Sequence, residues 1–218
     1  MQKYLPVIKS CPLFGGMSTE DIDSVLSCLG AQVQAYMKNA EVLSAGDRAR
    51  YVGLVLSGSV RVERVDYRGN RSVTARIMPG QLFAEAFACA QTENLPVSVC
   101  AAEETRVMFI DAQRIIHACA NACGFHTQLI YNLMRILAMK NLTMQQKMEA
   151  LTQRTTREKL MTYLMSCAGT GGAFEIPFDR QELADYLAVD RSGLSTEIGK
   201  LRREGVIRCE KNCFEILK

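Results

Sequence analysis

The spacing of apolar residues changes along the chain and divides it into regions of different predicted structure. A short helix is expected first, in "STEDIDSVLSCLG", where Ser18 can act as the N-cap. The pattern then has a period of two through "YVGLVLSGSVRVERV", "RGNRSVTARIMPG" and "PVSVCAAEETRVMFID". Turn signals at Gly69-Asn70 and Pro79-Gly80 separate these runs. Short strands at this spacing predict a β-sandwich or barrel from about Val33 to Ile110.

From about Ala112 the apolar period becomes helical. Apolar residues step by threes and fours, and a long helix with such a seam usually buries it against a partner helix. We therefore expect a dimer interface formed by Ile130, Leu133, Leu137, Met144 and Met148. The alternative is a seam that packs on the chain's own β-domain.

The C-terminal part of the chain is predicted to be a second domain. A helix in "TTREKLMTYLMSCA" is followed by three closely spaced glycines, then by "FEIPF", two helical segments and a hairpin turning at Lys211-Asn212. We expect two domains: residues 1–148, including the long helix at about 112–148, and residues 149–218.

The segment "FDRQELADYLAVDRSGLSTEIGKLRREGVI" carries the clearest motif. Asp179 and Glu182 have the spacing of a capping box at the start of a first helix. A short turn through Val189 and Asp190 leads to a second helix. Apolar residues give both helices an inward face, and Ala184 is small where they would cross. This pattern predicts a helix-turn-helix.

In a helix-turn-helix, the N-terminal residues of the second helix face the DNA major groove. The candidate DNA-contacting residues of that helix are Arg191, Ser192, Ser195, Thr196 and Lys200. Arg191 can offer two donors to a guanine, while the hydroxyls can serve bases or phosphates. The alternative is a helical hairpin that only packs. Residues 149–218 contain 11 Lys or Arg and 11 Asp or Glu, and this neutrality weakens the electrostatic argument for DNA.

Composition narrows the class of protein. The chain has 218 residues, of which 48% are hydrophobic and 22% charged, and none of its apolar runs reaches the roughly 20 residues of a membrane span. The first residues lack the pattern of a secretory signal. Nine cysteines, an odd number, suggest a reducing compartment, so we expect a cytoplasmic protein. The net charge of +3 gives weak support for an anionic partner.

Three stretches together resemble the Crp/Fnr family, that of cyclic-AMP receptor protein and the fumarate–nitrate reductase regulator. They are "PLFGGMSTEDIDSVL", "AGDRARYVGLVLSGSVRVERVDYRGNRSVTARIMPGQLFAEAF" and the helix-turn-helix segment. The resemblance implies an α+β fold with an N-terminal cyclic-nucleotide-binding-like β-roll, a long dimerisation helix and a C-terminal winged helix-turn-helix. It also implies a homodimeric transcription regulator that binds a double-stranded DNA operator, with RNA polymerase as a candidate partner.

The resemblance assigns roles to individual residues of the DNA-binding segment. The arginine of family members that matches Arg191 reads a base, and the pair that matches Arg180 and Gln181 holds phosphate. Thr196 stands where many relatives carry an arginine, which leaves the operator sequence open.

The resemblance also locates an effector pocket formed by Phe83, Ala84, Glu85, Val97 and Ser98. Cyclic-nucleotide-binding relatives have a Phe-Gly-Glu turn here, followed by an arginine that neutralises the cyclic phosphate. In this chain Val97 takes the place of that arginine, and Ala84 that of the glycine. A buried phosphate without its cation would cost several kcal/mol, so we expect that cyclic AMP does not bind. A neutral or apolar molecule, or no ligand, are the remaining alternatives.

Cys119, Cys123 and His126 share one face if their segment is helical, and thiolates with an imidazole suit zinc or an iron cluster. A metal- or redox-sensing regulator is therefore an alternative function, while the favoured interpretation is that these side chains only pack. An enzyme is not expected, because the sequence has no nucleophile elbow and no glycine-rich phosphate loop.

Overall fold

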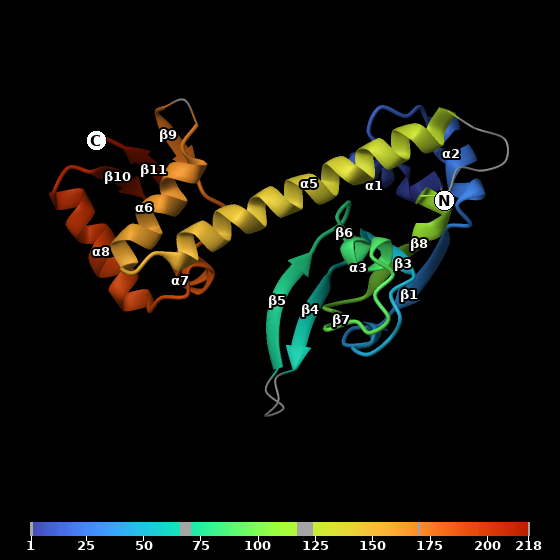
Figure 1. Ribbon diagram of the computed structural model, residues 1–218, viewed down its shortest axis with the longest axis horizontal. Helices are drawn as coiled ribbons and strands as arrows, with labels where there is room; N and C mark the ends of the chain where they lie inside the picture. The colour runs from blue at the N-terminus through green and yellow to red at the C-terminus, as the bar shows by residue number, and fades with distance from the viewer. Residues whose placement is uncertain (1, 66–70, 117–123, 170, 218) are drawn as a thin grey trace. The chain divides into compact units, whose positions relative to one another are not determined.

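The computed structural model describes residues 2–65, 71–116, 124–169 and 171–217. The chain divides into two compact units, Met1–Ala138 and Met139–Lys218, and the division falls inside the long helix (Figure 1). In the described part of the chain, no helix has both the length and the apolar character that a membrane crossing requires.

The first unit begins with a layer of short helices: η1 (Gln2–Tyr4), α1 (Leu5–Ser10), η2 (Pro12–Phe14) and α2 (Thr19–Cys28). Helix α2 starts where the sequence predicted, because the Ser18 hydroxyl accepts from the Asp21 amide at 3.2 Å. The Asp21 carboxylate accepts from the Ser18 amide in return and completes a capping box. Apolar side chains of these helices, such as Leu13 and Ile22, are fully buried.

Two four-stranded antiparallel sheets form the β-roll. The first has the order β1-β8-β3-β6 and the second the order β2-β7-β4-β5. The strands are β1 (Gln32–Tyr36), β2 (Glu41–Leu43), β3 (Tyr51–Ser57), β4 (Val60–Val65), β5 (Arg71–Ile77), β6 (Leu82–Phe83), β7 (Ser98–Ala101) and β8 (Thr105–Asp111). The predicted β-domain is confirmed almost to the residue, and α3 (Glu85–Cys89) interrupts it after β6.

Strand β3 is buried along nearly its whole length, because both of its faces are covered. Leu54 and Leu56 belong to the core shared with the N-terminal helices, whereas Val55 belongs to the core inside the roll. Gly53 leaves room for the ring of Phe83, since a Cβ at this position would lie 2.1 Å from the Phe83 Cζ. Alternate side chains of β3 therefore enter two different apolar cores, rather than one apolar core and the solvent.

The first unit continues with α4 (Ala112–Ile116) and ends inside α5 (Gly124–Thr152), whose residues from Met139 onward belong to the second unit. The sequence predicted helix from about residue 112, and residues 117–123 lie outside the described part. In its first half α5 buries Leu129 and Leu133 against the core of the first unit. The Asn132 side-chain amide donates to the carbonyl oxygens of Leu13 and Gly15, each at 2.9 Å, and fixes the helix to the N-terminal layer.

The second unit contains α6 (Thr156–Cys167), α7 (Arg180–Leu187) and α8 (Arg191–Arg203) with a three-stranded sheet of order β10-β11-β9 (Figure 1). Its strands are β9 (Ala173–Glu175), β10 (Ile207–Glu210) and β11 (Cys213–Ile216). The hairpin between β10 and β11 turns at Lys211, whose φ of 51° is left-handed, as the prediction of a turn at Lys211-Asn212 requires. These elements form the winged helix-turn-helix that the resemblance implied.

Candidate nucleic-acid interface and sensor pocket

The two helices of the motif begin and end on local signals. The Asp179 carboxylate accepts from the Glu182 amide at 2.8 Å, and Glu182 closes the capping box at the start of α7. Helix α7 ends at Leu187, and the C-cap residue Ala188 adopts a left-handed conformation. Asp190 then caps α8 by accepting from the Gly193 amide at 2.8 Å. The turn between the helices is thus defined at both of its ends.

A single core holds α7 against α8. The predicted inward residues are all buried: Leu183, Ala184, Leu187, Leu194, Ile198 and Leu201. They pack with Leu160 and Leu164 of α6 and with Phe214 of β11. Ala184 is fully buried, as expected for a small residue at the crossing of the two helices.

The face of α8 opposite this core is open to solvent. Four residues spaced by four, three and four share it, namely Ser192, Thr196, Gly199 and Arg203. Arg191 and Ser195 are also exposed, and in the described part of the chain their side chains make no hydrogen bond or ion pair. The predicted DNA-contacting residues of α8 are therefore all accessible, with Lys200 exposed further along the helix.

Two of the predicted hydroxyl groups already donate within the protein. The Ser192 hydroxyl donates to the Asp190 carboxylate at 2.5 Å and lowers the pKa of Asp190. The Thr196 hydroxyl donates to the Ser192 carbonyl oxygen at 2.9 Å. Both oxygens keep lone pairs, so towards DNA they can accept from cytosine or adenine amino groups without breaking these bonds.

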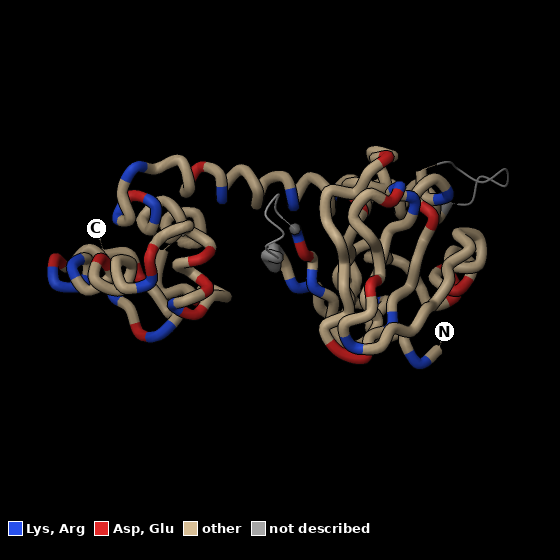
Figure 2. Tube along the Cα trace, turned by 90° about the horizontal axis from the view of Figure 1, so that it is seen from below, with Lys and Arg blue, Asp and Glu red and all other residues tan. Residues whose placement is uncertain are grey.

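The neutral charge of the C-terminal domain conceals an uneven distribution. Acidic and basic positions are interleaved along its backbone in Figure 2. Glu197 of α8 and the C-cap residue Glu204, however, are both paired with α6: Arg157 of α6 donates to Glu204 at 3.1 Å and lies 3.6 Å from Glu197. The hydrogen bond from Arg157 lowers the pKa of Glu204 and keeps it ionised. The acidic charges are thus tied to α6, which leaves the solvent face of α8 basic.

Sequence reasoning missed two arginines at the end of α8. Arg202 and Arg203 line a hollow of about 510 Å³ together with Thr196 and Gly199. The spacing of seven residues from Thr196 to Arg203 would have placed Arg203 on the same face. These arginines extend the basic face to the C-terminal end of the helix.

Arg180 and Gln181, the predicted phosphate ligands, both have partners inside the domain. The Arg180 guanidinium donates to the Cys209 Sγ at 2.7 Å and lies 5.0 Å from the centre of the Phe214 ring. Gln181 donates to Asp185 one turn further along α7. Arg180 is therefore half-buried on the wing sheet, and it joins the start of α7 to β10 and β11.

In the sensor domain, the predicted pocket begins at a strained turn. Phe83 is buried over Gly53 and packs edge-on against Phe109, with 6.4 Å between the ring centres. Ala84 has a φ of 60°, the left-handed conformation that favours glycine. Glu85 begins α3 and is 4% exposed. The turn that presents a glycine in cyclic-nucleotide-binding relatives is thus kept here with an alanine.

The second half of the predicted pocket adjoins the first through the roll core. Val97 precedes β7 and is half-buried, and Ser98 starts that strand. Val99, the next residue, shares the roll core with Phe83 and Ala84. The Ser98 hydroxyl accepts from the Ala45 amide at 3.0 Å, so it already serves the β2–β3 loop.

The three candidate metal ligands are not all described. Cys119 and Cys123 lie outside the described residues. His126 is buried, and its Nε2 lies 3.2 Å from the carbonyl oxygen of Arg114. Within the described ranges, no three His, Cys, Asp or Glu side chains are grouped as a metal site would require. The hydrogen bond gives His126 a role in attaching α5 to α4.

The predicted dimer seam is divided between two environments. Leu133 is 4% exposed and belongs to the core of its own unit, so its side chain is not available to a partner helix. Leu137 is half-buried against the same core, and Ile130 is also half-buried. Met144 and Met148 are exposed. Packing on the chain's own domain, the alternative to a dimer seam, therefore holds for Leu133.

Comparison with known proteins agrees with this architecture. The family model described as "Cyclic nucleotide-binding domain" matches residues 33–122, and that described as "Crp-like helix-turn-helix domain" matches residues 158–218. The chain is 26% identical to the cyclic AMP receptor protein of Thermus thermophilus, covering 96% of this chain and 94% of the relative. It is 25% identical to the transcriptional activator protein FnrA of Stutzerimonas stutzeri, covering 96% of this chain and 88% of that protein.

Among solved structures, the Thermus thermophilus catabolite activator protein is similar, with a TM-score of 0.51 and 26% identity over 94% of this chain and 93% of that one. A β-roll, a long helix and a winged helix-turn-helix together form the architecture of one class of transcription regulators. This chain belongs to the Crp/Fnr family of that class, with a cyclic nucleotide-binding domain followed by a Crp-like helix-turn-helix.

The left-handed conformation of Ala84 predicts that Ala84→Gly stabilises the protein. An alanine in this conformation costs about 1–2 kcal/mol, while glycine adds about 0.4–1 kcal/mol of unfolded-state entropy, so a net gain of about 0.5–1 kcal/mol is expected. Urea unfolding followed by circular dichroism measures it. Ala86→Gly, in the exposed part of α3, is the control and should destabilise. Destabilisation by both variants would contradict a strained Ala84.

Proposed function

We propose that this protein is a homodimeric, sequence-specific DNA-binding regulator whose sensor domain does not respond to cyclic AMP. The observation that carries the DNA-binding part is the solvent face of α8, which is basic although the domain is neutral. Arg191 begins this helix without any competing partner in the described part of the chain. A guanidinium in that position can form the two parallel hydrogen bonds that recognise a guanine.

The remaining polar residues of α8 support a division of labour in DNA recognition. Lys200 lies 3.2 Å from Glu197, which reduces its charge towards a phosphate, whereas Arg202 and Arg203 have no ion pair in the described ranges. We assign phosphate contacts to these two arginines and base contacts to Arg191, Ser195 and Thr196. Arg180 can add a phosphate contact only through the guanidinium N–H groups that do not donate to Cys209. A threonine hydroxyl cannot offer the bidentate donors of an arginine, so the operator should differ from those of relatives with arginine at this position.

Dimerisation is typical of this family, and an apolar stripe on α5 supports it here. Tyr131, Met134, Ala138 and Leu142 follow one another at steps of three, four and four, and all are exposed. Met134 is 65% exposed and Leu142 is 51% exposed. A contiguous row of exposed apolar side chains is typical of an interaction surface. This stripe lies on the side of α5 opposite Leu133, whereas Met144 and Met148 of the predicted seam lie closer to the Leu133 side of the helix. We propose that it packs against the same stripe of a second subunit.

The environment of the sensor turn supports a pocket without phosphate recognition. Val97 brings no charge, the Ser98 hydroxyl is engaged by Ala45, and the roll interior around Phe83 and Phe109 is apolar. A cyclic phosphate placed there would lose its water without gaining a cation. We propose that this pocket takes a neutral or apolar molecule, or that it is filled by the protein's own side chains.

The base-reading role of Arg191 is tested on an operator selected from random DNA. Arg191→Ala should cost about 1–3 kcal/mol per half-site and relax preference at one base pair, with little change in salt dependence. Arg203→Ala is the matched control: it should weaken binding to every sequence and flatten the salt slope by about one ion per contact. Fluorescence anisotropy on matched and single-base-changed operators at two salt concentrations measures both effects. If the matched-to-mismatched ratio stays unchanged at every base pair in Arg191→Ala, Arg191 does not read a base.

The dimer stripe is tested with Met134→Glu combined with Leu142→Glu. Each charge would be buried without a partner at the interface, at a cost of about 3 kcal/mol or more, so light scattering should give the mass of one subunit. Thr143→Glu adds the same charge on another side of the helix, where Thr143 is exposed, and should remain a dimer. A dimer for the double variant would place the subunit contact elsewhere.

The absence of a cyclic AMP response is tested by calorimetry and by thermal unfolding. Cyclic AMP at millimolar concentration should neither bind detectably nor raise the melting temperature. Val97→Arg is the informative comparison, because it supplies the cation and should bind more tightly than the wild type does. Micromolar affinity of the wild-type protein would contradict the proposed sensor chemistry.

A further inference from the structure

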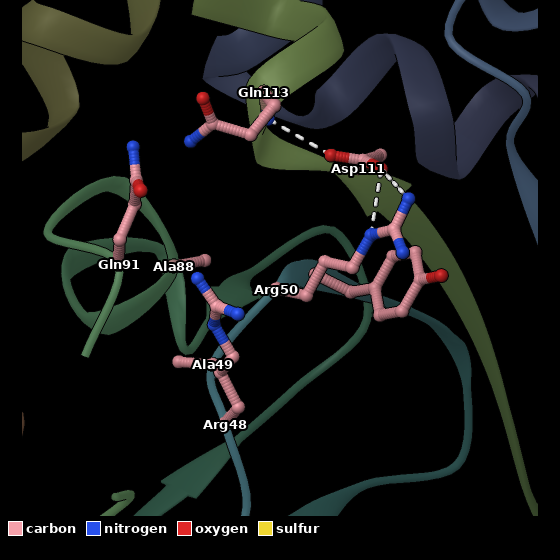
Figure 3. Close-up of a pocket in the computed structure, with 8 residues that line it drawn as sticks. Arg48, Ala49, Arg50, Ala88, Gln91, Asp111 and Gln113 are labelled. Atoms are coloured by element: carbon pink, nitrogen blue, oxygen red, sulfur yellow. Dashed lines mark hydrogen bonds and ion pairs between the residues drawn. The ribbon is translucent and has the colours of Figure 1, made fainter. Parts of the chain in front are cut away.

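A cavity of about 500 Å³ lies beside the start of β3 (Figure 3). None of the five predicted pocket residues lines it. Its polar side chains come from three separate segments of the sensor domain: Arg48 and Arg50 before β3, Gln91 after α3, and Asp111 and Gln113 at the junction of β8 with α4. Buried Ala49 and Ala88 add apolar surface. Its volume is within the range of small-molecule sites.

One of the two arginines is ion-paired with a carboxylate of the cavity. Arg50 donates to the Asp111 Oδ2 from Nε at 2.9 Å and from Nη2 at 2.8 Å. Asp111 is 6% exposed, and its Oδ1 accepts a hydrogen bond from the backbone amide of Gln113 at 2.9 Å. The carboxylate is therefore satisfied on both oxygens, and it is not available to a cationic ligand. The charges of Arg50 and Asp111 cancel.

Arg48 supplies the net charge of the cavity. In the described part of the chain it makes no ion pair or side-chain hydrogen bond. Figure 3 shows its guanidinium extending into the cavity between Gln91 and the Arg50–Asp111 pair, while the Gln91 and Gln113 side chains approach each other across the same space. The cavity thus combines one guanidinium, which can donate two parallel hydrogen bonds, with amide groups that can add further donors.

We propose that this cavity is a binding site for a small organic anion with a single carboxylate or phosphate group, which Arg48 binds. A guanidinium matches the geometry of both oxyanions, and one net positive charge suits one such group. The apolar surface of Ala49 and Ala88 suits an uncharged organic portion. The site goes beyond the proposed function, because it lies outside the predicted effector pocket and needs no cyclic nucleotide.

The ligand would touch segments that connect the sensor to the long helix. Ala88 belongs to α3, which begins at Glu85, and Gln113 belongs to α4, which α5 follows in the chain. An anion held by Arg48, Gln91 and Gln113 would therefore bridge the end of α3 to the start of α4. Such a ligand acts on a different part of the sensor from the Phe83-Ala84-Glu85 turn.

Titration calorimetry on the full-length protein at constant ionic strength tests the site. The probes are sodium benzoate, phenyl phosphate and benzamide, the last being a neutral analogue of benzoate. At least one anion should bind and benzamide should not; the tighter anion tells whether the site prefers a carboxylate or a phosphate. Arg48→Gln should weaken that anion at least about tenfold, the fold-change expected for losing a charge-assisted hydrogen bond.

Lys38→Gln is the matched control, because Lys38 is exposed in the same domain and does not line the cavity. It should bind the anion as the wild type does. Arg48 is exposed, so Arg48→Gln should keep the melting temperature of the ligand-free protein; Arg50 is left intact because its loss would unpair buried Asp111. Absence of anion binding up to about 10 mM, or equal affinity in Arg48→Gln, would overturn the proposal. Since no DNA is present, either result leaves the test of Arg191 independent.

Discussion

Burial of β3 on both faces is the constraint on which the sensor domain depends. Alternate side chains of one strand contribute to two separate cores, with Leu54 and Leu56 in one and Val55 in the other. The N-terminal helices and the first half of α5 pack on one side, and the roll closes on the other. Successive side chains of a strand point to opposite faces, so a slip by one residue would exchange the side chains that enter the two cores. The register of β3 therefore determines which side chains fill each core of the sensor domain. The lack of a side chain at Gly53 then decides where Phe83 lies, and Phe83 leads directly into the sensor turn.

Two parts of β3, its start and the region of Gly53, adjoin different chemical environments. At one end, Arg50 and Asp111 join the entry of β3 to the end of β8 and shape the cavity beside Arg48. Near the middle, Gly53 and Phe83 fill the inside of the roll with aromatic surface. The sensor domain therefore separates positive charge from apolar volume, whereas a cyclic-nucleotide pocket has to combine them. The departure at Val97 is consistent with this separation.

In the DNA-binding domain, the equivalent constraint is the ion-paired contact between α6 and α8. Arg157 holds Glu197 and Glu204, which would otherwise add negative charge beside the recognition face. The pairs are partly exposed and add little to stability. These ion pairs matter because they hold the carboxylates of Glu197 and Glu204 against α6. The charged side chains that α8 presents to solvent are then those of Arg191, Arg202 and Arg203. A domain without net charge can thus still offer a basic surface to DNA.

The sequence by itself determined the elements whose signals are local. Capping residues at Ser18 and Asp179, the period of two through the roll and the turn at Lys211-Asn212 each depend on neighbours a few residues away, and all were predicted correctly. The family resemblance added the architecture. Only the tertiary structure decided which side chains remain available. Leu133 belongs to the apolar seam predicted from the sequence, but its side chain is buried in the core of its own domain. The Arg180 guanidinium donates a hydrogen bond to a cysteine 29 residues further along the chain. The physical reason is that a residue's availability depends on partners brought close by folding, and those partners have no fixed spacing in the sequence.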